Sequence, residues 1–195
     1  HLAENDEDIA YSGASFGCRP GQDAEELGRT GAEGCQAHCV KVDGQEVDFA
    51  ALTGLVVIYA YPKTGRPDVP APADWHMIPG AKGCTPQSCA FRDHHADLRA
   101  LGVDHVFGLS TQDTDWQREA VARMHLPFAL VSDAGLRLAN ALNLPRMEVA
   151  GETLLRRLTL IVRNGVIERH FYPVFLPEAN AGEVCDWLRA QGSDA

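Results

Sequence analysis

The hydrophobic positions of this chain form short apolar runs of strand length, separated by longer segments with helical spacing. The run at residues 55–60 is apolar throughout, which is typical of a strand buried on both faces. The pattern also predicts strands at 103–110, 128–131, 154–162 and 166–171, and helices at 84–101, 115–124, 136–142 and 177–190. Strands that alternate with helices in this way predict an α/β fold, with a central mixed β-sheet and helices on both faces.

Two tight turns in the sequence indicate β-hairpins. Asp43-Gly44 lies between two short apolar segments, and Asn164-Gly165 lies between the predicted strands at 154–162 and 166–171. Both dipeptides favour the positive backbone φ angles that two-residue hairpin turns require. We therefore expect antiparallel pairing at the start of the sheet and again near its end.

The chain divides into an acidic N-terminal extension, residues 1–34, and one domain, residues 35–195. The extension is rich in Gly, Ser and Ala and reads as a tail. The 195 residues contain 45% hydrophobic residues and no internal repeat, which suits one substantial core. Within the domain, residues 61–83 are rich in proline and glycine, so we expect an ordered loop over the site.

Two cysteines supply the most informative chemistry. Cys84 stands at the predicted start of a helix and Cys89 follows five residues later. The unpaired N–H groups and the positive dipole end of a helix start stabilise a thiolate, so Cys84 is the expected nucleophile. Five helical residues separate the two Cα atoms by roughly 8 to 9 Å, more than the roughly 7 Å that a disulfide spans. A Cys84–Cys89 bond therefore requires the first turns of the helix to unwind.

Several motifs give the chain a resemblance to the peroxiredoxins. These are Tyr61-Pro62-Lys63, Gly83-Cys84-Thr85-Pro86, Cys89-Ala90-Phe91-Arg92-Asp93, and the strand from Arg157 to Val162 followed by Asn164-Gly165. The chain is most similar to the bacterioferritin-comigratory, atypical two-cysteine type, from about residue 40 to 188. The resemblance implies a thioredoxin-like fold and thiol-dependent reduction of peroxides.

The resemblance also implies roles for residues outside the cysteine pair. Pro62 matches the active-site proline, and Arg157 matches the arginine that holds the thiolate and orients the peroxide. Its neighbour Arg156 is the competing candidate. Adjacent strand residues point to opposite faces, so only one of the two arginines can reach the site. The family's hydroxyl residue three positions before the cysteine is Ala81 here. Its role passes to Thr64, to Thr85 or to no residue.

The expected cycle starts with reduction of hydrogen peroxide or an organic hydroperoxide at Cys84, which becomes a sulfenic acid. Condensation with Cys89 then gives a disulfide, which a thioredoxin-like or glutaredoxin-like dithiol reduces. The alternative is a redox-sensing or partner-binding protein on the same scaffold, with little turnover. The change at position 81 and the additional cysteines motivate that alternative.

The net charge and the spacing of the remaining cysteines exclude some classes of binding partner and ligand. The net charge of −10 argues against nucleic acid and anionic membranes, and no apolar run has the length of a membrane span. We expect a cytoplasmic monomer or homodimer.

Cys35, His38 and Cys39 lack the paired spacing of a structural zinc site, so no metal or other cofactor is expected. Three roles remain open for Cys18, Cys35 and Cys39: they are inert, form a disulfide, or act as a second resolving pair. Cys185 is expected in the core.

Overall fold

A computed structural model describes residues 38–41 and 43–192. It contains nine strands, five α-helices and one 3-10 helix in those residues. The strands are β1 (His38–Lys41), β2 (Glu46–Asp48), β3 (Leu55–Ala60), β4 (Val103–Ser110), β5 (Ala129–Ser132), β6 (Arg146–Val149), β7 (Glu152–Leu155), β8 (Leu158–Arg163) and β9 (Val166–Phe171). The helices are η1 (Trp75–Met77), α1 (Cys84–Asp93), α2 (His95–Ala100), α3 (Thr114–Met124), α4 (Arg137–Ala141) and α5 (Asn180–Gly192).

Seven strands form one mixed sheet in the order β2-β1-β5-β4-β3-β8-β9. The three central strands β5, β4 and β3 are parallel, while β8 runs antiparallel to β3 and β9 antiparallel to β8. β1 joins β5 in antiparallel register and pairs with β2. Both predicted hairpins are confirmed. At the second, Asn164 and Gly165 have φ angles of 49° and 77°, as this tight turn requires.

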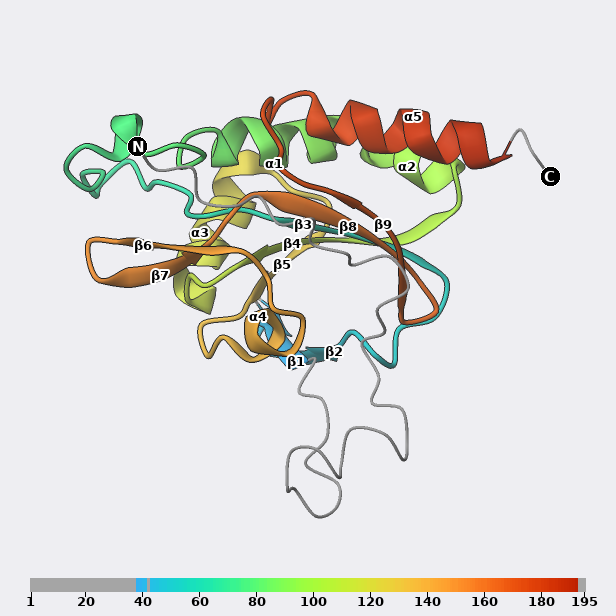
Figure 1. The fold of residues 1–195 in the computed structure, drawn as a ribbon, viewed down its shortest axis with the longest axis horizontal. Coiled ribbons are helices and arrows are strands. Elements are labelled where there is room, and N and C mark those ends of the chain that lie inside the picture. The colour runs from blue at the N-terminus through green and yellow to red at the C-terminus, as the bar shows by residue number, and fades with distance from the viewer. Residues whose placement is uncertain (1–37, 42, 193–195) are drawn as a thin grey trace, which may run out of the picture.

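The central strand β3 divides the core between the two faces of the sheet. Val56, Ile58 and Ala60 pack on the face covered by α4, and Val57 and Tyr59 pack on the face covered by α1, α2, α3 and α5. Figure 1 shows α1, α2 and α5 together on one side of the strands and α4 on the other. The predicted α/β fold with helices on both faces is therefore confirmed. The expected extension, residues 1–34, lies outside the described residues.

Two elements that we predicted as continuous are each divided into two in the structure. The helix expected at 84–101 is interrupted at His94, which has non-helical angles between α1 and α2. The strand expected at 154–162 consists of the end of β7 and most of β8, separated by Arg156 and Arg157. The break at these two arginines matters because it lets the side chain of Arg157 point into the protein interior.

Candidate active site

Cys84 is the first residue of α1, as its sequence context predicted. Its side chain is 4% exposed, and its Sγ lies 3.5 Å from the carbonyl oxygen of Ala81. The helix start presents unpaired backbone N–H groups and the positive end of the dipole to this sulfur. The thiol is thus held at the edge of the core, at the positive end of the helix dipole.

Gly83 makes the approach to Cys84 possible. Its φ of 99° belongs to the left-handed region, and a Cβ at this position would lie 2.5 Å from Cγ of Pro177. Any other residue would be strained by its backbone and would collide with the proline ring. The segment that precedes α5 is therefore packed directly against the start of α1.

Arg157 brings a guanidinium to the sulfur. Its Nη2 lies 3.5 Å from Sγ of Cys84 and also donates to the carbonyl oxygens of Lys82, at 2.7 Å, and Gly80, at 3.3 Å. The side chain is only 3% exposed. Two backbone acceptors from the loop before Cys84 therefore fix the arginine against the thiol.

The charge of Arg157 is not balanced by a carboxylate among the residues that the structure describes. Its Nη1 donates to Oε1 of Gln87, a neutral acceptor, and its Nε has no partner within the described ranges. A buried cation without an anionic partner is costly. A Cys84 thiolate would supply that partner, so the two side chains are complementary when the cysteine is ionised.

Three further buried side chains connect this arginine to α5. Nε2 of Gln87 donates to Oδ1 of Asn180 at 3.0 Å, and Oγ1 of Thr159 donates to the same oxygen at 2.6 Å. Gln87, Asn180 and Thr159 are all fully buried. They were missed in the sequence. Only the position of Gln87, three residues after Cys84 in the helix, pointed toward the site.

Cys89 lies in the same helix as Cys84, is partly exposed, and is a free thiol. Neighbouring residues anchor this part of α1 to the sheet. The hydroxyl of Tyr59 donates to Oγ of Ser88 at 3.1 Å, and the ring of Tyr59 stacks on Phe91 with centroids 4.4 Å apart. A bond between the two cysteines requires the turns between them to unwind, which would open the Tyr59–Ser88 hydrogen bond.

Two buried tyrosines line the same face of the sheet as Cys84. Burial raises the pKa of both Tyr59 and Tyr61 above the usual range, so their hydroxyls stay protonated at neutral pH. Both tyrosines therefore add buried, uncharged surface around the thiol.

Pro62 and Thr64 are buried at the start of the loop that follows β3. Oγ1 of Thr64 donates to Oε1 of Gln112 at 3.0 Å, and the carbonyl oxygen of Thr64 accepts from Nε1 of Trp116 at 2.7 Å. Nζ of Lys63 also makes a cation–π contact with the ring of Trp116, 5.2 Å from its centroid. These contacts fix the beginning of the loop, and they direct the Thr64 hydroxyl to Gln112 rather than to Cys84.

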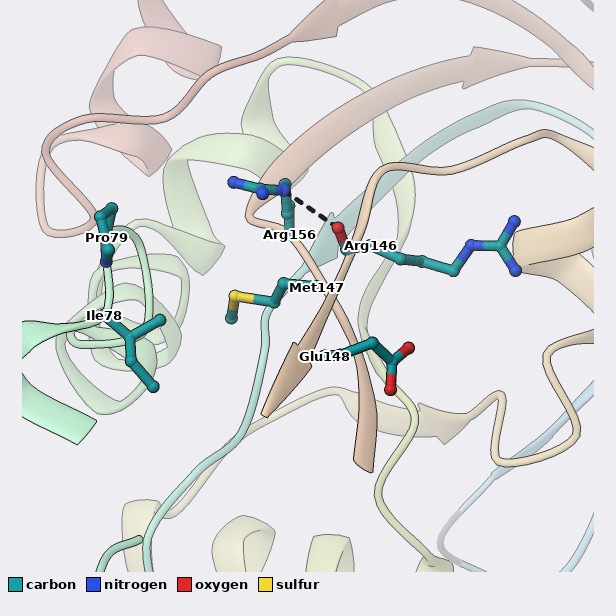
Figure 2. A pocket seen from close by; sticks show the side chains of 6 residues that line it. All are labelled: Ile78, Pro79, Arg146, Met147, Glu148 and Arg156. Carbon is teal, nitrogen blue, oxygen red and sulfur yellow. Dashed lines mark hydrogen bonds between the residues drawn. The ribbon is translucent and has the colours of Figure 1, made fainter. Parts of the chain in front are cut away.

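Arg156 points away from the thiol, into a surface cavity. The cavity measures about 460 Å³ and is lined by Ile78, Pro79, Arg146, Met147, Glu148 and Arg156. Figure 2 shows it between the 78–79 segment and the β6–β7 hairpin. The opposite directions of the two adjacent arginines agree with the expectation that only one reaches the cysteine.

The other candidate residues fall into two groups. Cys185 is fully buried in α5, where burial raises its pKa, so the expected core position is confirmed. Cys18 and Cys35 lie outside the described residues, and only the backbone of Cys39 is described, in β1. Across residues 38–41 and 43–192, no group of three metal-ligating side chains occurs. No helix in those ranges has the length and apolar character to cross a bilayer.

Comparisons with known proteins show which family this chain resembles. The Redoxin family profile matches residues 30–185. Peroxiredoxin Q, chloroplastic, from Oryza sativa subsp. japonica is 30% identical over 149 residues, which are 76% of this chain and 61% of that protein. The chain thus spans about six tenths of the length of this curated relative.

Solved structures share the fold. Peroxidoxin BcpB from Mycobacterium tuberculosis aligns with a TM-score of 0.63 and 20% identity, covering 78% of this chain and 91% of that one. Xanthomonas campestris Peroxiredoxin Q aligns with a TM-score of 0.61 and 22% identity, covering 78% and 89%. The thioredoxin-like fold that the motifs implied is confirmed by these likenesses. The profile match over most of its length shows that the chain belongs to the Redoxin family.

Proposed function

We propose that this protein is a thiol-dependent peroxidase that reduces hydrogen peroxide or organic hydroperoxides at Cys84. The observation that carries the proposal is the buried guanidinium of Arg157, which lies 3.5 Å from the Cys84 sulfur and has no carboxylate partner in the described part of the chain. Such a group stabilises a thiolate and also offers hydrogen bonds to a peroxide oxygen. The names of the relatives support the same chemistry.

In the first step, the Cys84 thiolate attacks one peroxide oxygen and forms an S–O bond while the O–O bond breaks. The sulfur is oxidised to a sulfenic acid, and the other oxygen leaves with the bonding electron pair and takes a proton to become water or an alcohol. Arg157 is placed to stabilise the charge that moves from sulfur to the leaving oxygen. The backbone carbonyls of Gly80 and Lys82 hold the arginine for this task.

Thr64 has a supporting role in this proposal. Its hydroxyl donates to Gln112, which follows β4, so its hydrogen is already used in a bond away from Cys84. Of the three options for the hydroxyl missing at Ala81, Thr64 is therefore not favoured as a direct contact of the peroxide. We assign Pro62 and Thr64 to shaping the loop that leads to Cys84.

In the second step, the sulfenic acid condenses with Cys89, forming an S–S bond and releasing water. Both cysteines lie in one helix, so α1 must unwind, and the Tyr59–Ser88 and Gln87–Asn180 hydrogen bonds must open. A thioredoxin-like or glutaredoxin-like dithiol then reduces the disulfide by thiol exchange. We place this antioxidant activity in the cytoplasm, whose reducing environment keeps cysteines available for such a cycle.

The proposal is tested by peroxide consumption with thioredoxin and its reductase as the electron source. The wild-type protein should consume peroxide in proportion to the reductant supplied, and Cys84→Ser should not. Cys185→Ser serves as the matched control, because Cys185 is a buried thiol in α5 that the cycle does not use. Equal activity of the wild type and Cys84→Ser would refute the proposed function.

A further inference from the structure

The part of α1 between Cys84 and Cys89 is tied to the sheet through Ser88. The hydroxyl of Tyr59, in β3, donates to Oγ of Ser88 at 3.1 Å, and both side chains are fully buried. Breaking a buried hydrogen bond of this kind is costly, because a hydroxyl that loses its partner stays out of reach of water. The contact therefore stabilises the folded helix at the point where a Cys84–Cys89 bond requires it to unwind.

The same tyrosine also holds the part of α1 that can stay in place. The ring of Tyr59 stacks on Phe91, with centroids 4.4 Å apart and planes within 8° of each other. One residue further on, Nη1 of Arg92 donates to the carbonyl oxygen of Met124 at 2.8 Å. Phe91 and Arg92 both follow the second cysteine, so disulfide formation does not require these contacts to open. Tyr59 thus binds the fixed part of the helix with its ring and the moving part with its hydroxyl.

The sheet leaves room for the Tyr59 hydroxyl at Gly108. Gly108 is the partner of Tyr59 in the parallel register of β3 and β4. A Cβ at Gly108 would lie 2.6 Å from the Tyr59 hydroxyl oxygen and would also collide with Cδ2 of Leu130. Any larger residue would displace the tyrosine or the leucine, because interiors are close-packed. The position of the hydroxyl under α1 is therefore built into the packing of the sheet.

Gln87 also ties this part of α1 to the rest of the protein, but it serves the first step as well. Its side chain accepts from Arg157 and donates to Asn180, so a change there disturbs the arginine at the reacting sulfur. The bond between Tyr59 and Ser88 joins two side chains to which the first step assigns no role. Its loss therefore acts on the unwinding of α1 rather than on the attack on the peroxide.

We propose that the Tyr59–Ser88 hydrogen bond is a latch that sets the rate at which the Cys84 sulfenic acid condenses with Cys89. The inference rests on the proposed peroxidase function and names the contact that regulates its second step. Condensation takes place only in the unwound helix, so its rate follows the fraction of molecules in which this bond has opened. Tyr59 and Ser88 are positioning residues in this step, because they act through the conformation of α1.

The latch also sets how long the sulfenic acid is exposed to a second peroxide. That peroxide transfers one oxygen to the sulfur, which becomes a sulfinic acid, and leaves as water or an alcohol. This second oxidation accelerates with peroxide concentration, whereas condensation within one molecule does not. A helix that is held folded therefore makes Cys84 more sensitive to excess peroxide.

The test measures the first-order rate constant of disulfide formation after a single addition of hydrogen peroxide. Acid quenching and intact-mass analysis separate the sulfenic acid, which carries one added oxygen, from the disulfide, which has lost two hydrogens. Tyr59→Phe keeps the ring and removes the donor, and Ser88→Ala removes the acceptor. Each should accelerate disulfide formation by roughly three- to tenfold, which is the contribution of one buried hydrogen bond expressed as a rate ratio. The peroxide concentration that converts half of the Cys84 to sulfinic acid should rise by the same factor.

A double variant and a control separate the latch from a general loss of stability. Both substitutions remove the same bond, so the variant with Tyr59→Phe and Ser88→Ala together should be no faster than the faster single variant. Tyr61→Phe is the matched control, because it removes the hydroxyl of an equally buried tyrosine that lies beside Ser110 and Gln117. It should leave the rate of disulfide formation unchanged.

Three results would overturn the inference: single variants that form the disulfide no faster than the wild type, effects that multiply in the double variant, or an equal acceleration in Tyr61→Phe. The proposed function fails in a different way, because the formation of the sulfenic acid is measured separately as the step that depends on peroxide concentration. If wild-type Cys84 is not oxidised by hydrogen peroxide, the proposed function itself fails. If Cys84 is oxidised but the disulfide forms equally fast in all variants, only the latch fails.

Discussion

The guanidinium of Arg157 lies 3.5 Å from the sulfur of Cys84, although 73 residues separate them in the sequence. The contact exists because the strand pattern is interrupted between β7 and β8, where Arg157 turns inward and Arg156 turns outward. The arginine in turn binds the carbonyl oxygens of the loop that ends at Cys84. The sulfur, the cation and the loop therefore form one buried unit.

Replacement of Arg157 tests whether this unit is catalytic. Arg157→Gln keeps a hydrogen-bonding side chain but removes the charge. We expect the rate of Cys84 oxidation by hydrogen peroxide to fall by about 10²- to 10³-fold, the usual effect of losing one stabilising group at the reacting atoms. Stopped-flow measurement of the first turnover provides the rate. Arg163→Gln, at the other end of β8, removes a partly exposed arginine paired with Glu168 and should change the rate little.

Asn180 tests whether the buried hydrogen bonds behind Arg157 position it. Asn180→Leu leaves the donors of Gln87 and Thr159 without their shared acceptor. We expect the free energy of unfolding to fall by about 2–4 kcal/mol. The peroxide rate should fall by roughly ten- to a hundredfold, because Gln87 is no longer fixed against the arginine.

Thr159→Val is the matched control for Asn180, because it removes one donor and leaves the Gln87–Asn180 bond intact. It should cost about 1 kcal/mol in urea unfolding and slow the reaction less. If Asn180→Leu loses stability but reacts with peroxide as fast as the wild type, the network has a structural role only.

Thr64→Val distinguishes a loop anchor from a residue that contacts the peroxide. The substitution removes the hydroxyl that donates to Gln112 and leaves the backbone N–H of Thr64 bonded to the same oxygen. We expect a loss of about 1 kcal/mol of stability and a change in peroxide rate below about threefold. A hundredfold slower reaction in a folded variant would show that the hydroxyl takes part in the chemistry after all.

Asp133 gives a pH-dependent prediction. Burial raises the pKa of its carboxyl group, although the backbone N–H groups of Leu138 and Ala139 bind it and oppose the rise. The folded state therefore holds this proton to higher pH than the unfolded chain, whose Asp pKa is about 3.9. The contribution is fully present below about pH 4 and is lost as pH rises through the folded pKa.

The comparison variant is Asp133→Asn, which does not titrate. The free energy of unfolding of the wild type, minus that of Asp133→Asn, should decrease as the pH is raised from about 4 toward neutrality. Urea unfolding at a series of pH values measures this difference. A difference that stays constant or grows with pH would contradict the raised pKa.

Much of the fold was predictable because strong local patterns agree with the tertiary structure. The strands at 55–60 and 103–110 coincide with β3, which is buried at all six positions, and β4, which is buried at Val103 and from Val106 to Ser110. The break at His94 was missed because neither proline nor glycine marks it. Strand β6 was missed because its hairpin turns through Ala150 and Gly151, and alanine rarely adopts the positive φ of 51° found here.

The candidate site was predictable only where local signals exist. Cys84 was found from its place at a helix start, which is a property of a few adjacent residues. Arg157 was found through the family resemblance. Asn180 and Thr159 carry no local signal, because their importance comes from hydrogen bonds that span 93 residues in one case and 21 in the other. Long-range polar contacts of this kind are fixed by the packing of α5 against α1.

The most direct test of the account is the first turnover of the fully reduced protein with hydrogen peroxide, followed by intact-mass analysis and peptide mapping of the product. Fast oxidation in the wild type, ending in a Cys84–Cys89 disulfide, is the predicted result. Cys89→Ser should react once and stop at an oxidised Cys84, and Cys84→Ser should not react at this rate. Oxidation no faster than that of a free thiol, or a disulfide that does not include Cys84, would contradict the account.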